Sequence, residues 1–311
     1  MDRREFLGAA AAVTATAAYG SGAPLPRRPY KNGIDLSIIA FGGIVVCGLS
    51  QAEGSRRVAE AYDRGLNYFD CAPAYFNGEA ELKLGEALKP YRSKVFLAEK
   101  TGHRDAKGAR EELERTLERF HTDHVDLYQF HAVTKKEEVE RIFGPKGAME
   151  TFQAARQAGK VRFIGFSAHS VEVAIAAMDR YDFDTILFPI NFVLTSQANF
   201  GPQVIAHARK KGVGIMAIKG MAKTTWPESI SRDHPHEKCW YEPGDFPHEA
   251  ALGYRWTLSQ PITAAMPPGD ERYFRLGMDI GQNFTPVTNQ EERKLMASAA
   301  GVNPIFHLGA A

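Results

Sequence analysis

The repeating unit of this chain is clearest in two adjacent segments, Glu111-Glu-Leu-Glu-Arg-Thr-Leu-Glu-Arg-Phe120 and Val125-Asp-Leu-Tyr-Gln-Phe-His131. In the first segment Leu113, Leu117 and Phe120 recur at helical spacing, so one face of a helix is apolar. The second segment is a short and mostly apolar run, which is typical of a buried strand. The two segments together predict a helix that is followed by a strand.

The same alternation extends along most of the chain. We expect strands at 36–43, 67–70, 94–100, 125–131, 161–167, 185–191, 213–219 and 262–266, and helices at 52–64, 79–88, 106–120, 148–158, 171–180, 203–211 and 247–259. Eight strand-and-helix units favour a closed barrel of parallel strands over an open sheet. No Gly-x-Gly-x-x-Gly pattern opens a helix after an early strand, which weakens the open dinucleotide-binding alternative. We therefore predict the α/β class and a (β/α)8 TIM barrel, a single domain over residues 24–311.

Composition is that of an ordinary globular protein. The chain has 311 residues, of which 44% are hydrophobic and 24% are charged, and its formal net charge is +1. Lysine and arginine are scattered rather than clustered, so nothing favours a nucleic-acid or membrane-surface partner. The three cysteines show no paired spacing, and a disulfide framework is not expected.

The first residues are typical of an export signal. Arg3 and Arg4 precede a short Ala- and Thr-rich run, and small residues follow at 15–17. This layout resembles a twin-arginine signal peptide over residues 1–23. The apolar run is too short and too weakly hydrophobic for stable membrane insertion. We expect export to the periplasm by the twin-arginine machinery; an Ala-rich N-terminal helix or membrane anchor remains an alternative.

Four polar residues lie where predicted strands end. Asp70, Lys100 and His131 close three successive strands, and Tyr75 follows Asp70 by one short loop. Alternate residues of a strand share a face, and adjacent strands lie about 4.8 Å apart. We therefore expect these side chains to meet at the mouth of the barrel. Taken singly, each has a plainer structural explanation, such as a helix cap, a rim charge or a packing residue.

This set of residues resembles the catalytic tetrad of the aldo/keto reductase family. The resemblance matches Asp70, Tyr75, Lys100 and His131 in order, and it extends through 40–43, 159–167, 212–219 and 251–256. It implies that Tyr75 is the general acid/base, that Lys100 favours its phenolate, and that Asp70 keeps Lys100 charged. His131 would orient the substrate carbonyl. The implied activity is the interconversion of an aldehyde, ketone or keto-sugar with an alcohol.

The family resemblance also implies a nicotinamide cofactor, NADPH or NADH. NADPH is slightly favoured, because Arg272 or Arg275 could meet a 2′-phosphate. The chain departs from the family at Ala168-His169, where Ser-Asn is common, and at Leu187, where Gln is common. The residues expected to contact the cofactor are Gly42, Ser167, Asn191, Lys219, Gly269, Arg272 and Arg275.

A long polar segment, 222–246, interrupts the alternation before the last unit. Loops of this length are usually functional or disordered. Its aromatic residues favour a substrate lid formed by Trp226, Trp240 and Tyr241. The segment also contains His234, His236 and Cys239, but their spacing matches no familiar zinc pattern, so no metal is predicted.

Two other functions stay open at the level of sequence. The departures at Ala168 and Leu187 are compatible with a non-catalytic barrel that binds nucleotide or regulates a partner. A Schiff-base aldolase that uses Lys100 is a further alternative, since lysines at strand ends can act as amine nucleophiles. Asp70 would hold that lysine charged, which argues against this chemistry.

Overall fold

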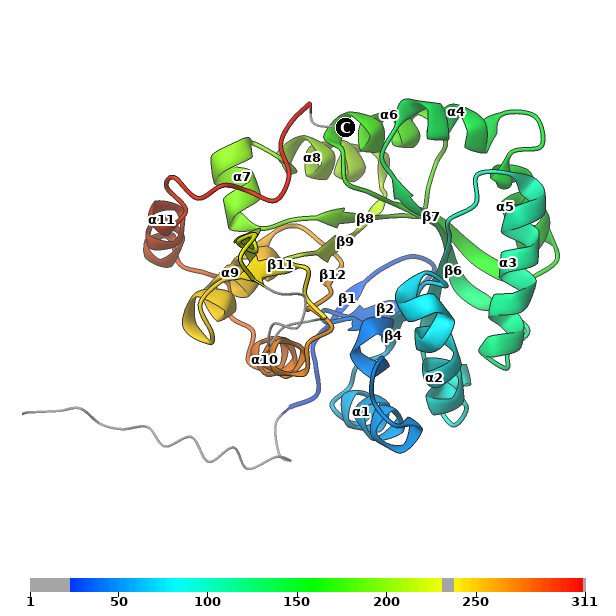
Figure 1. Ribbon diagram of the computed structural model, residues 1–311, viewed down its shortest axis with the longest axis horizontal. Coiled ribbons are helices and arrows are strands. Elements are labelled where there is room, and N and C mark those ends of the chain that lie inside the picture. Colours follow the sequence, from blue (N-terminus) through cyan, green and yellow to red (C-terminus); the bar gives the residue numbers. More distant parts are fainter. Residues whose placement is uncertain (1–22, 231–237, 310–311) are drawn as a thin grey trace, which may run out of the picture.

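The computed structural model describes residues 23–230 and 238–309, so the predicted signal segment lies outside the described residues except at its last position. A curved sheet of eight parallel strands forms the centre of the molecule (Figure 1). The strands run in chain order around it: β3 (Phe41–Gly42), β4 (Tyr68–Asp70), β5 (Phe96–Thr101), β6 (Val125–Val133), β7 (Val161–Ala168), β8 (Thr185–Pro189), β9 (Gly214–Ile218) and β12 (Ala264–Ala265).

The first and last parts of this sheet meet and close it into a barrel. Ile39 forms a parallel bridge with Ala265. The Ala40 amide donates to the Ala265 carbonyl oxygen at 3.0 Å, and the Ala265 amide donates to the Ile38 carbonyl oxygen at 2.9 Å. No edge of the sheet is therefore left open at this seam. The predicted (β/α)8 TIM barrel is confirmed. Seven of the expected strands are present at their predicted places, whereas the expected strand 36–43 is divided: residues 35–37 form an antiparallel pair outside the barrel sheet, and only 41–42 form a strand within it.

Helices surround the barrel, as Figure 1 shows. All seven predicted helices form: α1 (Gln51–Asp63), α2 (Glu79–Leu88), α3 (Ala106–Arg119), α5 (Ala148–Gln157), α6 (Val171–Arg180), α8 (Pro202–Lys211) and α9 (His248–Ser259). Four more had not been predicted: α4 (Lys136–Phe143), α7 (Phe192–Ala198), α10 (Glu271–Gln282) and α11 (Asn289–Ser298). Within 23–230 and 238–309, none of the helices is long and apolar enough to cross a bilayer.

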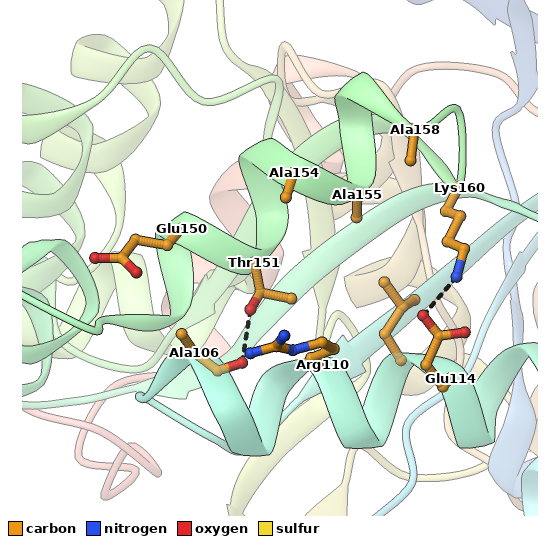
Figure 2. A pocket seen from close by; sticks show the side chains of 10 residues that line it. Ala106, Arg110, Glu114, Glu150, Thr151, Ala154, Ala155, Ala158 and Lys160 are labelled. Carbon is orange, nitrogen blue, oxygen red and sulfur yellow. Dashed lines mark hydrogen bonds and ion pairs between the residues drawn. The ribbon is translucent and has the colours of Figure 1, made fainter.

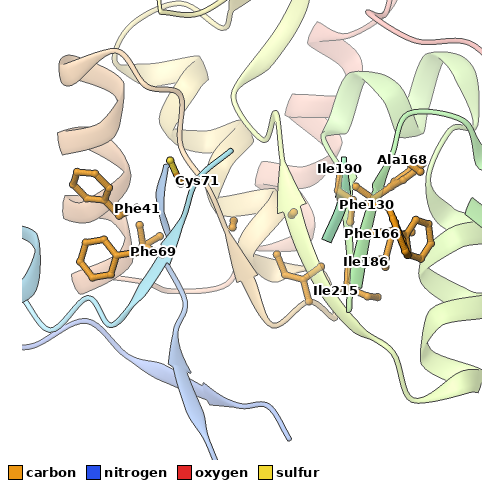
Figure 3. Packing of buried hydrophobic residues seen from close by; sticks show 14 of the residues in the cluster. Phe41, Phe69, Cys71, Phe130, Phe166, Ala168, Ile186, Ile190 and Ile215 are labelled. Carbon is orange, nitrogen blue, oxygen red and sulfur yellow. The ribbon is translucent and has the colours of Figure 1, made fainter. Parts of the chain in front are cut away.

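The outer faces of the strands pack against these helices through large apolar side chains. Phe130 on β6 stacks on Phe152 of α5, with ring centres 3.9 Å apart. Figure 3 shows Phe41 and Phe69 on one part of the wall and Phe130 with Phe166 on another. These residues point away from the barrel axis. Alternation along each strand therefore leaves the remaining residues inside the barrel.

The inside of the barrel is filled at its amino-terminal end. An antiparallel hairpin of β1 (Arg27–Pro29) and β2 (Asp35–Ser37) crosses this end. Its Tyr30 ring packs edge-on against Phe96 at 5.7 Å and Phe163 at 5.1 Å. The interior of a barrel of this kind is a packed core rather than a pore. The predicted polar residues of the site therefore lie at the opposite, carboxyl end.

Candidate active site

The carboxyl ends of three neighbouring strands bring the predicted polar residues together. Tyr68 and Asp70 on β4, Ala98 and Lys100 on β5, and Leu127 and Gln129 on β6 are successive inward positions. In each pair the apolar or aromatic residue belongs to the inner core, and the polar residue lies one step nearer the mouth. The alternation expected from the sequence therefore places Asp70 and Lys100 side by side.

Lys100 and Asp70 form an ion pair that is completely buried. The Lys100 ammonium donates to Asp70 Oδ1, to the Cys71 carbonyl oxygen at 2.7 Å, and to the Tyr75 hydroxyl at 3.4 Å. A buried charge is tolerated only where partners satisfy it. All three ammonium protons therefore have acceptors, and one of them points at the predicted acid/base.

The environment sets the charge state of this group of residues. Burial, the largest single effect, lowers the pKa of Lys100, but Asp70 together with Tyr75 and Glu99 outweighs burial and raises the pKa above its ordinary value. Burial raises the pKa of Tyr75 to about 12, although the Lys100 charge acts in the opposite direction. The sequence predicted that Lys100 lowers the pKa of Tyr75. Lys100 does act in that direction, but burial has the larger effect and raises the pKa. Tyr75 is a neutral phenol at pH 7.

Gln129 is a member of the site that the sequence analysis did not single out. Its amide nitrogen donates to Asp70 Oδ2 at 2.9 Å, and the side chain is fully buried. Asp70 thereby has one partner on each oxygen, Lys100 and Gln129. Gln129 occupies the inward position immediately before His131, so strand alternation alone could have identified it.

His131 is held at the mouth by an irregularity in β6. The register between β6 and β7 shifts after Phe130, and Ala132 adopts a left-handed φ of 51°. The Ala132 amide donates to Ser167 Oγ at 2.7 Å, and Arg104 donates to the His131 carbonyl oxygen at 2.6 Å. Bulges of this kind redirect a side chain. The imidazole ring lies edge-on to Tyr75 with ring centres 5.8 Å apart.

Neutral imidazole is the form of His131 in this setting. Burial lowers the pKa of His131 to about 3, and the positive charges of Lys100, Arg104 and Lys219 add to the effect. A neutral imidazole donates one hydrogen bond from a ring nitrogen. The residue can therefore donate a hydrogen bond to a carbonyl oxygen, as its predicted role requires, without itself carrying charge.

A cavity of about 260 Å³ opens beside Tyr75 and His131. None of its described lining residues carries a carboxylate, while Lys219 and Lys238 contribute amines. The cavity is lined by Gly42, Ile44, Tyr75, His131, Ser167, His169, Leu187, Ile218, Lys219, Lys238, Cys239, Trp240, Tyr241, Met266, Pro267, Pro268 and Gly269. It therefore combines the predicted acid/base, an apolar wall and an excess of positive charge.

The residues expected to hold the nicotinamide lie around this cavity, with one exception. Gly42, Ser167 and Lys219 line it. Asn191 is buried and caps α7: its oxygen accepts from the Leu194 amide at 2.8 Å, and its nitrogen donates to the Lys219 carbonyl oxygen at 3.0 Å. Asn191 therefore positions the backbone of Lys219 rather than facing the cavity.

The segment expected to hold a cofactor phosphate carries its own negative charges. Asp270 caps α10 by accepting from the Arg272 amide at 3.0 Å, and Glu271 occupies the first turn. Arg272 pairs with Asp270, and Arg275 pairs with Glu60 and Glu271. A helix N-terminus binds anions through free amides, and here a carboxylate of the chain takes that place. Both arginines are thus already paired with carboxylates of the chain.

Gly269 is required by packing. It is buried, and a Cβ atom placed on it would lie 2.4 Å from Ile44 Cγ2. The atom that lies closest to the missing Cβ of Gly269 therefore belongs to the Ile44 side chain. Its backbone still lines the cavity.

The segment 222–246 begins and ends as an antiparallel hairpin of β10 (Ala222–Thr225) and β11 (Tyr241–Pro243). Trp240 and Tyr241 line the cavity, Trp240 being 55% exposed and Tyr241 buried. Trp226 is outside the lining and donates from its indole to the Cys239 carbonyl oxygen at 2.8 Å. Two of the three expected lid residues therefore border the cavity.

The candidate metal ligands in this segment lie mostly beyond what the structure describes. His234 and His236 are outside the described residues, and Cys239 is a buried free thiol. Among the residues that are described, no cluster of three or more potential ligands is present.

His169 and Lys219 form a pair that the sequence did not indicate. His169 Nε2 lies 3.2 Å from Lys219 Nζ, across the mouth from β7 to the end of β9. The two residues are distant in sequence, and no local pattern links them. They meet because β7 and β9 are separated by a single strand, β8, in the curved sheet.

A second hollow, of about 410 Å³, lies on the outside of the barrel between α3 and α5 (Figure 2). Its polar groups largely satisfy one another: Thr151 donates to the Ala106 carbonyl oxygen at 2.6 Å, and Lys160 pairs with Glu114. It is formed by helix surfaces rather than strand ends. We therefore place the candidate active site at the mouth of the barrel.

Comparison with known proteins agrees with this location. The model of the aldo/keto reductase family matches residues 39–245. Aldo-keto reductase YhdN of Bacillus subtilis is 35% identical over 151 residues, which are 45% of this chain and 44% of that protein. L-galactose dehydrogenase of Arabidopsis thaliana is 26% identical over 211 residues, which are 62% of this chain and 64% of that protein. The matches thus span from under half to just under two thirds of these curated relatives.

Solved structures show the same fold at low sequence identity. The holo form of aldo-keto reductase AKR11C1 from Bacillus halodurans superposes with a TM-score of 0.70 at 20% identity, covering 90% of this chain and 98% of that one. Glycerol dehydrogenase AKR11B4 from Gluconobacter oxydans gives a TM-score of 0.64 at 20% identity, with 93% and 99% covered. These similarities extend over nearly the whole barrel.

Replacing His169 with Gln is expected to make the fold less sensitive to acid. Burial, followed by the charges of Lys219 and His131, lowers the pKa of His169 to about 2, whereas an unfolded histidine titrates near pH 6.5. The unfolded chain therefore binds the proton more readily, so the stabilisation is present above about pH 6.5 and is lost as the pH falls.

Urea-unfolding midpoints measured from pH 7 to pH 4 should fall less steeply for His169→Gln than for the unmodified protein. His248→Gln, at an exposed position on α9, serves as the control and should not change the slope. Identical slopes for all three proteins would contradict this account of the mouth of the barrel.

Proposed function

The chain belongs to the aldo/keto reductase family, and on that basis we propose that it is an NAD(P)H-dependent oxidoreductase that interconverts a carbonyl compound and an alcohol. One observation carries the proposal: the completely buried Asp70–Lys100 pair lies beside Tyr75 and His131 at a single cavity. Burying the Lys100 ammonium costs desolvation free energy. Because the ammonium donates toward the Tyr75 hydroxyl, we infer that the buried charge serves catalysis at the tyrosine.

Each residue then has a separate task in reduction. When bound, the reduced nicotinamide supplies a hydride to the carbonyl carbon. Tyr75 donates the hydroxyl proton to the carbonyl oxygen, and Lys100 stabilises the phenolate that this leaves. His131 donates a hydrogen bond to the same oxygen and fixes the direction of the carbonyl. Asp70 and Gln129 hold the Lys100 ammonium in place.

The charge state of Tyr75 supports reduction as the favoured direction. With burial raising its pKa to about 12, the phenol keeps its proton at pH 7 and is ready to donate it. Oxidation of an alcohol requires the phenolate instead. We therefore propose that the protein reduces carbonyl compounds at neutral pH and that alcohol oxidation becomes faster as the pH rises.

The proposed substrates are aldehydes, ketones and keto-sugars. The cavity has an apolar wall that includes Leu187, Ile218 and Met266, and the exposed Trp240 stands at its entrance. A relative that is 30% identical over 179 residues, covering 51% of this chain and 57% of that protein, is the 6-dehydroglucose reductase of Novosphingobium aromaticivorans. Trp240 offers a flat surface on which a sugar ring can stack.

The Schiff-base alternative at Lys100 has little support. The Lys100 ammonium has three acceptors, and its pKa is raised by Asp70, so the neutral amine that attacks a carbonyl is scarce. The non-catalytic alternative differs from our proposal in one outcome, which is cofactor binding without turnover.

Replacing Tyr75 with Phe should abolish reduction while leaving the cavity intact. Loss of a positioned general acid typically lowers turnover by about 100- to 10,000-fold. The assay is oxidation of NADH or NADPH in the presence of a panel of aldehydes, ketones and sugars with a free carbonyl. Tyr62→Phe is the matched control, because that ring stacks on Tyr91 away from the cavity.

Unchanged turnover by the Tyr75→Phe protein would rule out the proposed acid. Binding of nicotinamide to the unmodified protein with no turnover of any carbonyl in the panel would favour the non-catalytic barrel.

The cofactor is expected to be NADH at least as readily as NADPH, because carboxylates occupy the N-terminus of α10. Glu271→Gln removes one of them and leaves Arg57 and Arg275 with Glu60 as their remaining carboxylate partner among those described. Exposed ion pairs contribute at most about 1 kcal/mol, so the preference should move toward NADPH by up to about fivefold. Fluorescence titration with both nucleotides measures this ratio.

The control for this measurement is Glu137→Gln, an exposed carboxylate in the first turn of α4. It should leave the ratio unchanged. A preference of the unmodified protein for NADPH greater than tenfold would contradict the role assigned to Asp270 and Glu271.

We also propose export by the twin-arginine machinery to the periplasm, which rests on residues 1–23 of the sequence. Replacing Arg3 and Arg4 together with Lys should keep the protein inside the cell, since the export machinery reads the arginine pair. Cell fractionation with immunodetection provides the measurement. Equal distribution of the two proteins between the fractions would count against export by this route.

A further inference from the structure

Lys219 occupies an unusual backbone position at the end of β9. Its φ of 60° lies in the left-handed region, which residues other than glycine rarely adopt. The Asn191 side chain donates to the Lys219 carbonyl oxygen at 3.0 Å and fixes this conformation. As a result the side chain enters the cavity that Tyr75 and His131 also line.

The surroundings of the Lys219 amine are aromatic. Nζ lies 3.2 Å from His169 Nε2, 5.5 Å from the centre of the Trp240 ring and 5.8 Å from that of Phe306. His169 and Phe306 stack on each other with ring centres 5.3 Å apart, so they form one continuous wall. Across the described stretches of the chain, no carboxylate pairs with Lys219.

These surroundings favour a neutral amine. Burial lowers the pKa of Lys219 to about 7, with the charge of Lys100 adding to the effect and Cys239 acting against it. The imidazoles of His169 and His131, which face the same space, are neutral chiefly because they are buried. Lys219 therefore differs from Lys100 in the one property that controls nucleophilicity, the presence of a free lone pair at pH 7.

We propose that Lys219 is a nucleophilic amine that condenses with aldehydes or ketones in this cavity to form a Schiff base. This is a second chemistry at the mouth of the barrel, and it requires no nicotinamide. The class of ligand is the same as that of the proposed reductase, a small carbonyl compound. The amine, however, bonds to the carbonyl carbon, whereas Tyr75 and His131 act on the oxygen.

The reaction balances without an added oxidant or reductant. The Nζ lone pair forms a bond to the carbonyl carbon, and the electrons of the carbonyl double bond move to oxygen. The oxygen then leaves as water, taking both amine protons with it, and a carbon–nitrogen double bond remains. His169 Nε2, at 3.2 Å from the attacking nitrogen, holds the amine in position, and both amine protons pass to the departing oxygen.

Reductive trapping tests this proposal directly. The intact protein is incubated at pH 7 with limiting propanal and sodium cyanoborohydride, and the modified peptide is identified by mass spectrometry. An ordinary lysine with a pKa near 10.4 has roughly one amine in 2,500 unprotonated at pH 7, whereas a pKa near 7 leaves about half. We expect Lys219 to react on the order of a thousandfold faster than exposed lysines, so a single propyl adduct should dominate.

Two lysine-to-arginine substitutions test whether the adduct forms on Lys219 and not on a neighbouring lysine. Lys219→Arg keeps the positive charge but removes the nucleophile, and the dominant adduct should disappear. Lys223→Arg is the matched control four residues along, where the amine pairs with Glu249 at 2.8 Å, and trapping should be unchanged. Tyr75→Phe should lose reduction yet retain the adduct, which separates failure of this inference from failure of the proposed function.

The rate of trapping should also rise between pH 6 and pH 8, with its midpoint near 7. The groups that face the amine and contribute to this profile are His169, His131, Lys100 and Cys239. An adduct spread over exposed lysines or the N-terminal amine, an adduct at Lys100, or no adduct at all would each overturn the proposal. Peptide mapping of the unmodified protein gives this answer even if Lys219→Arg fails to fold.

Discussion

The buried pair of Lys100 and Asp70 is the constraint around which the mouth of this barrel is organised. Both side chains are completely removed from solvent, so every polar atom of the pair must be satisfied by protein. Gln129, the Cys71 carbonyl and Tyr75 meet that need from β6, the end of β4 and the loop after it. Removing either charged partner would leave an uncompensated ion in the core, at a cost of about 3–5 kcal/mol.

Most strands and helices of the barrel could be predicted because short stretches of sequence are enough to identify them. Strand alternation in Val125–Val133 and helical spacing in Ala106–Arg119 are visible in short windows, and the strand ends bring Asp70 and Lys100 together without knowledge of any distant contact. The short helix α7 and the helix α10 were missed for a different reason. Residues 192–198 had been assigned to no element, and Asn191, which caps α7, was expected to contact the cofactor. The first turns of α10 had been interpreted through Arg272 and Arg275 as possible phosphate contacts.

Properties that depend on contacts between different strands could not be predicted from the sequence. The left-handed Ala132 redirects His131 only because Ser167 on the neighbouring strand accepts its amide hydrogen. The contact of His169 with Lys219 joins residues fifty positions apart. The balance that raises the pKa of Tyr75 depends on how deeply the ring is buried, which a residue pattern does not encode. The type of chemistry at the site was therefore more predictable than its electrostatics.

The packing of Tyr30 against Phe96 and Phe163 limits how small molecules can reach the cavity. Side chains fill the amino-terminal end of the barrel, so among the described residues no passage runs along the barrel axis from that end to the cavity. A cofactor and a substrate that both bind in the cavity would therefore enter and leave at the same end of the barrel, on the side where Trp240 lies.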